Sequence, residues 1–144
     1  NKIIIRSRSE ESGCYQVFDK QLLPNGIHKE QYITLPGHNF AFGQPPTHIF
    51  IVHAPADWTR EQYFKMKGER SSGRLIDDHE ANVDYQLLVN YRYATDWLDS
   101  MYRVACGLYE SDMPEIVRFN MYDSKEQIKQ QMTNKIKEIL EKMN

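Results

Sequence analysis

Among the residues of this chain that can perform chemistry, His53 and Asp57 are the best-placed pair. His53 ends a short apolar run at residues 47–53, and Asp57 follows four positions later. A histidine transfers protons near neutral pH when a carboxylate orients its ring. One hypothesis is therefore a small enzyme that acts on a phosphorylated or nucleic-acid substrate, with His53 and Asp57 as catalytic residues. The simpler interpretation, which we favour, is that His53 is structural or solvent-exposed.

Four consecutive residues, Asp77, Asp78, His79 and Glu80, resemble a metal-binding set. Carboxylates beside an imidazole suit a divalent cation. Contiguous residues converge on one ion only where the backbone turns sharply, however, and this cluster contains no glycine. If the cluster opens a helix, its carboxylates instead stabilise the positive N-terminal end of that helix. We therefore expect no metal ion at this cluster.

The other signals for catalysis or cofactor binding are weak. Residues 68–74 contain two glycines, two serines and two arginines, which can hold a phosphate, but they lack the Lys-Ser/Thr pair of phosphate-binding loops. Neither Cys14 nor Cys106 is flanked by the signature of a catalytic cysteine. The sequence therefore predicts no catalytic residue outside the hypothesis above, and no cofactor.

Residues 60–84 separate their charges by sign. Residues 60–74 carry five basic and two acidic side chains, whereas residues 75–84 carry four acidic side chains and no Lys or Arg. Few aliphatic residues between positions 68 and 82 can be buried. A segment of this kind in mid-chain is typical of a linker or of a loop that binds a partner. The pattern favours docking through a charged central loop at residues 66–79.

We expect this loop and the helix before it to form a partner-binding surface. Basic side chains would meet acidic groups of the partner, and aromatic side chains, with Phe64 among them, would act as anchors. The predicted binding residues are Trp58, Arg60, Tyr63, Lys65, Lys67, Arg70 and Arg74. The acidic half of the segment would repel a polyanion, so a protein partner or a second copy of the chain is favoured over nucleic acid.

A direct nucleic-acid binder remains a third hypothesis. It would add Arg6, Arg8 and the lysines near the C-terminus to the central loop. Those lysines alternate with glutamates, a pattern typical of a solvated helix. We therefore give this hypothesis less weight than the first two.

The composition indicates an ordinary soluble domain. The chain has 144 residues, 40% of them hydrophobic and 26% charged, with a net charge of −2. No apolar run approaches the roughly 18 residues of a membrane span, and Arg6 follows the first isoleucines too closely for a signal peptide. We expect one domain over residues 1–144, a cytoplasmic location, no membrane and free thiols. A well-patterned domain without family motifs also suggests a viral or accessory-element origin, in which case the location is the host cytoplasm or the virion.

The elements that must position these residues are strands in the first half and helices in the second. Alternating or continuous apolar runs predict strands at residues 2–8, 14–18, 31–35, 47–53 and 115–122. The run at residues 47–53 reads as a central strand that is buried on both faces. The expected fold class is α+β: a mostly antiparallel sheet of about four to five strands with two long helices and one short helix packed on one face.

Three helices are predicted from capping and periodicity. Thr59 and Gln62 form a capping box for a short helix that ends near Gly68, and Trp58 with Tyr63 forms a hydrophobic staple. Ser124 and Gln127 form a second capping box for a helix that runs to the C-terminus. Between them, an apolar stripe with spacings of four and three predicts one helix over residues 84–109. Its members are Leu87, Tyr91, Ala94, Leu98, Met101, Ala105 and Leu108.

Overall fold

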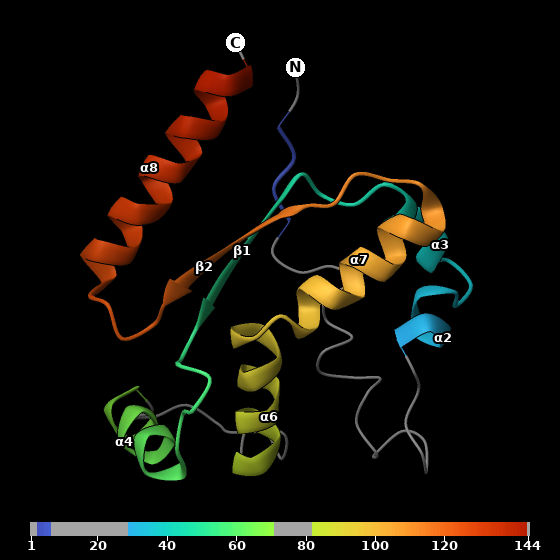
Figure 1. Ribbon diagram of the computed structural model, residues 1–144. Coiled ribbons are helices and arrows are strands. Elements are labelled where there is room, and N and C mark those ends of the chain that lie inside the picture. The colour runs from blue at the N-terminus through green and yellow to red at the C-terminus, as the bar shows by residue number, and fades with distance from the viewer. Residues whose placement is uncertain (1–2, 7–28, 71–81, 144) are drawn as a thin grey trace. The chain divides into compact units, whose positions relative to one another are not determined.

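The computed structural model describes residues 3–6, 29–70 and 82–143 (Figure 1). In chain order these residues form six helices and two strands: α2 (Lys29–Ile33), α3 (His38–Gly43), β1 (His48–His53), α4 (Arg60–Arg70), α6 (Val83–Ala94), α7 (Trp97–Tyr109), β2 (Glu115–Asn120) and α8 (Lys125–Met143). Backbone contacts divide the chain into two compact units. Unit 1 comprises Asn1–Ile49 and Thr95–Ile116, and unit 2 comprises Phe50–Ala94 and Val117–Asn144. The expectation of one domain stays a prediction.

The sheet differs from the expected one. β1 and β2 pair in parallel: the N–H of Glu115 donates to the carbonyl of Thr47, and the N–H of Met121 donates to that of His53, each at 2.9 Å. The prediction of a mostly antiparallel sheet of four to five strands is therefore wrong, since the described residues are mostly helical and contain two strands in one sheet. Parallel strands need a long crossover, which α4, α6 and α7 provide here.

The individual strand predictions have different outcomes. The runs at 47–53 and 115–122 are confirmed as β1 and β2. The run at 31–35 is wrong, because its first residues lie in α2. Residues 3–6 have no regular secondary structure, and the run at 14–18 lies outside the described residues. Short apolar runs suit a buried helix turn as well as a strand, which explains the error at α2.

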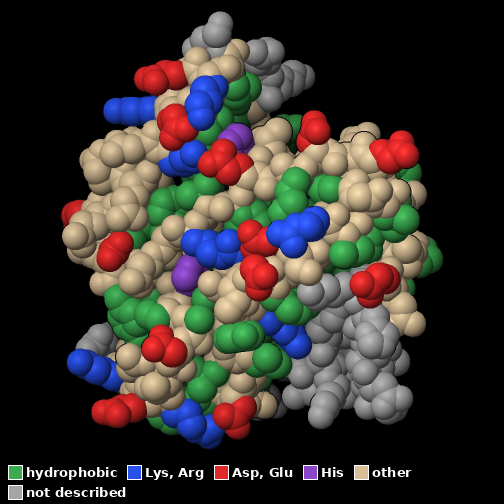
Figure 2. All heavy atoms as spheres, viewed as in Figure 1, with side chains coloured by type: hydrophobic (Ala, Val, Ile, Leu, Met, Phe, Trp, Pro, Cys, Tyr) green, Lys and Arg blue, Asp and Glu red, His purple; other side chains and the backbone are tan. Residues whose placement is uncertain are grey.

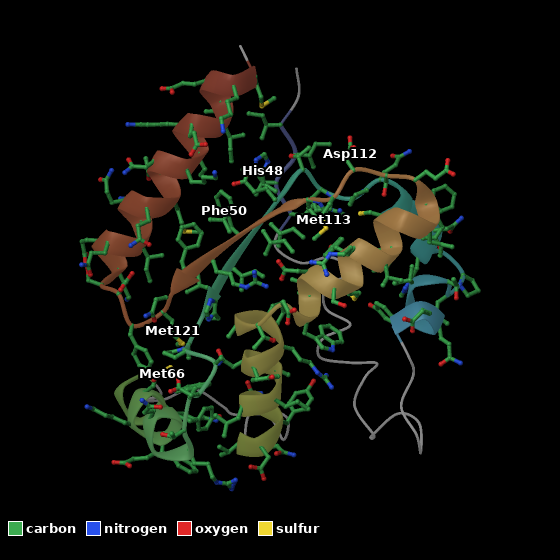
Figure 3. The ribbon with its side chains drawn as sticks, viewed as in Figure 1. His48, Phe50, Met66, Asp112, Met113 and Met121 are labelled. Carbon is green, nitrogen blue, oxygen red and sulfur yellow. The ribbon has the colours of Figure 1, made fainter. Side chains whose placement is uncertain are left out.

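β1 is buried on one face only, contrary to prediction. Ile49 and Ile51 are buried, whereas Val52, which points to the opposite face, is exposed. Phe50, labelled in Figure 3, packs edge-on against Phe119 of β2 with ring centroids 5.5 Å apart. The two strands are therefore joined by an aromatic pair as well as by backbone hydrogen bonds.

In unit 1, helices α2, α3 and α7 pack together. Leu98, Met101, Tyr102 and Ala105 of α7 are buried, at the spacing of one helix face. The ring of Tyr102 packs edge-on against Phe42 of α3, with centroids 5.7 Å apart. This part of the predicted apolar stripe, represented by Leu98, Met101 and Ala105, is therefore confirmed as core.

The predicted helix at 84–109 is instead two helices, α6 and α7, separated by Thr95 and Asp96. Each helix buries a face of its own, so the stripe does not continue across the break. Tyr91 and Leu108, both predicted to be buried, are exposed. At the end of α6, Arg118 Nε donates to the carbonyl of Tyr93 at 2.7 Å, which satisfies a group that the break leaves without a helical partner.

The orientation of α6 in unit 2 is set by a buried asparagine. Asn90 Oδ1 accepts a hydrogen bond from the N–H of Ala54 at 2.8 Å. Asn90 Nδ2 donates to the carbonyls of Ala54, at 3.3 Å, and Pro55, at 3.0 Å. One side chain therefore forms hydrogen bonds with three backbone groups just beyond the end of β1, and it is the partner of the buried Ala54 N–H.

Both predicted capping boxes are confirmed. The N–H of Thr59 donates to Gln62 Oε1 at 2.8 Å, and the N–H of Gln62 donates to Thr59 Oγ1 at 3.3 Å. The rings of Trp58 and Tyr63 lie 5.3 Å apart, as expected of the staple. α4 nevertheless continues through Gly68 to Arg70, so residues 66–70 are helical and not part of a loop.

At the start of α8, Ser124 and Gln127 bond in the same reciprocal way, at 2.8 and 3.1 Å. We expect Ser124→Ala to lower the free energy of unfolding by about 1 kcal/mol, because the N–H of Gln127 loses its partner. Ser124→Asp is the control, since aspartate caps helices about as well as serine. Urea unfolding followed by far-ultraviolet circular dichroism measures both. Equal destabilisation by Ala and Asp would show that the cap does not stabilise α8.

Candidate functional site

His53 and Asp57, the catalytic candidates, are not brought together. His53 Nδ1 donates to the carbonyl of Ala54, and Asp57 is exposed in the turn after β1. No carboxylate among the described residues forms an ion pair with His53. The orienting contact that proton transfer requires is therefore missing from this part of the chain.

Metal ligation has no candidate in the described ranges. Within residues 3–6, 29–70 and 82–143, no group of three or more His, Cys, Asp or Glu side chains is arranged to hold a metal ion. The cluster at residues 77–80 lies outside these ranges. Cys106 is a buried free thiol on α7.

Three of the predicted binding residues pack against one another. Tyr63 is buried, and Trp58 is half-buried with its indole N–H shielded from solvent and without a hydrogen-bond partner among the described residues. Lys67 Nζ donates to Tyr63 Oη at 2.8 Å and lies 5.2 Å from the centre of that ring. Trp58, Tyr63 and Lys67 therefore stabilise the attachment of α4, and little of their surface is open to a partner.

The open side of α4 carries Arg60, Phe64 and Lys65. Arg60 and Phe64 are four residues apart, so they lie next to each other on the helix surface. Arg70 is the last residue of α4, and its side chain lies outside the description, as does Arg74. Arg60 and Lys65 are therefore the predicted cations whose exposed side chains can be placed.

Helix α6 presents a second exposed row beside α4, because the two helices pack together. The row consists of Asp84, Leu88 and Tyr91, spaced four and three residues apart. Arg60 Nη1 donates to Asp84 Oδ1, so an ion pair joins the row to the open side of α4. We call Arg60, Phe64, Asp84, Leu88 and Tyr91 the α4–α6 surface.

The α4–α6 surface combines large apolar groups with both signs of charge. Phe64 is 57% exposed, Tyr91 52% and Leu88 38%. Both partners of the Arg60–Asp84 pair are well exposed, so the pair adds little to stability. Figure 2 shows the same mixture, with hydrophobic side chains interspersed among acidic and basic ones. Such a surface suits contact with another protein.

Sequence reasoning identified Arg60 and Phe64 but missed Leu88 and Tyr91. The spacing of Tyr91 continues the stripe of α7 and therefore predicts burial, and Leu88 lies beside that stripe. The break at Thr95 and Asp96 ends the stripe and turns Tyr91 outward. The sequence does contain a signal for this row. Leu88 and Tyr91 follow Asp84 at spacings of four and three, which places them on the same helix face, and the charge of Asp84 indicates that this face is exposed to solvent.

The longest described helix is α8, with 19 residues. None of the helices in the described part of the chain combines the length and the apolar character of a membrane span. Comparison with protein families, with curated proteins and with solved structures finds no match for this chain.

Proposed function

We propose that this chain is a non-enzymatic interaction protein that docks on a protein partner through the α4–α6 surface. The observation that supports the proposal is the exposure of Phe64, Leu88 and Tyr91 beside the Arg60–Asp84 ion pair. Aromatic side chains bury a large area on binding at a small cost in conformational entropy, and they are enriched among the residues that dominate interface energetics.

The charges of this surface favour a protein over a nucleic acid. The open side of α4 carries Glu61 beside Lys65, and Arg60 is already paired with Asp84. A nucleic-acid site needs unpaired cations that can replace the counterions of the phosphates.

Two of the lysines of α8 are paired within their own helix. Lys135 and Lys142 both pair with Glu138, at 3.3 and 2.6 Å. Their hydrogen bonds hold the pKa of the Glu138 carboxyl below its usual value, with Lys142 as the larger cause. The charge of Glu138 therefore offsets part of the positive charge of these two lysines. An enzymatic role for His53 and Asp57 likewise finds no support in the described geometry, so we do not propose one.

We expect Phe64→Ser and Tyr91→Ser each to weaken partner binding at least tenfold, a change of about 1.4 kcal/mol. Because both side chains are exposed, the free energy of unfolding should change by no more than about 0.5 kcal/mol. Proteins captured from the native source by the wild-type chain are purified, and their affinity for each variant is measured by calorimetry. Chemical unfolding gives the stability of each variant.

Matched controls are available in the chain. Phe40→Ser on α3 and Tyr122→Ser after β2 make the same substitutions at exposed positions outside the α4–α6 surface. Both controls should leave the affinity unchanged. The proposal fails if purified partners bind Phe64→Ser and Tyr91→Ser as tightly as the wild type, or if the controls weaken binding to the same extent.

A further inference from the structure

We draw no further inference here: the strongest candidate, the exposed apolar patch of Ile136, Leu140 and Met143 on α8, carries none because nothing in the described part of the chain shows what covers it.

Discussion

Replacing Leu98 with alanine is expected to lower the free energy of unfolding by about 3 kcal/mol, within the range for deletion of a fully buried leucine side chain. Leu98 is fully buried on α7, whose buried face also includes Met101 and Tyr102. Loss of the side chain removes its transfer free energy and leaves a cavity that rigid helix packing cannot fill. The loss should be measured by urea unfolding, with the change taken from the midpoint at constant slope.

Leu108→Ala is the matched control, because it makes the same substitution on the same helix. Leu108 is 54% exposed, whereas Leu98 is 0% exposed. The control should change the free energy of unfolding by no more than about 0.5 kcal/mol. If the two variants lose similar amounts of stability, the buried face of α7 is not the one described above.

Replacing Asn90 with alanine is expected to cost about 2 kcal/mol in unit 2. The change removes the three hydrogen bonds to Ala54 and Pro55 and leaves the N–H of Ala54 without a partner. The carbonyls of Ala54 and Pro55 keep the hydrogen bonds from His53 Nδ1 and from the N–H of Trp58. A buried polar group that loses its partner costs roughly 1–3 kcal/mol, and water that enters the gap recovers part of the loss. Urea unfolding measures the total.

Hydrogen exchange of the Ala54 amide tests the cause directly, since that N–H donates to Asn90 Oδ1. Its protection should fall in Asn90→Ala more than that of other β1 amides. The control is Asn134→Ala on α8, an exposed asparagine whose side chain accepts from Gln130 at 2.7 Å. That variant should keep its stability. A protected Ala54 amide in Asn90→Ala would mean that the asparagine does not position α6.

The sequence by itself determined those helices and strands that are encoded by residues a few positions apart. The capping boxes at Thr59 and Ser124 were predictable because each is a contact between residues three positions apart. The buried face of α7 followed from a spacing that one helix repeats, and β1 and β2 followed from short apolar runs. Patterns within one segment also identified Arg60 and Phe64 as residues of the candidate surface.

Only the tertiary structure decided how these elements combine. The parallel pairing of β1 with β2 joins Thr47 to Glu115 across the crossover, and no local pattern encodes that direction. The rotation of α6 is set by hydrogen bonds between Asn90 and Ala54, which are 36 positions apart. Because that rotation turns Tyr91 to solvent, the candidate surface depends on contacts between distant residues. Periodicity within one segment could not predict it.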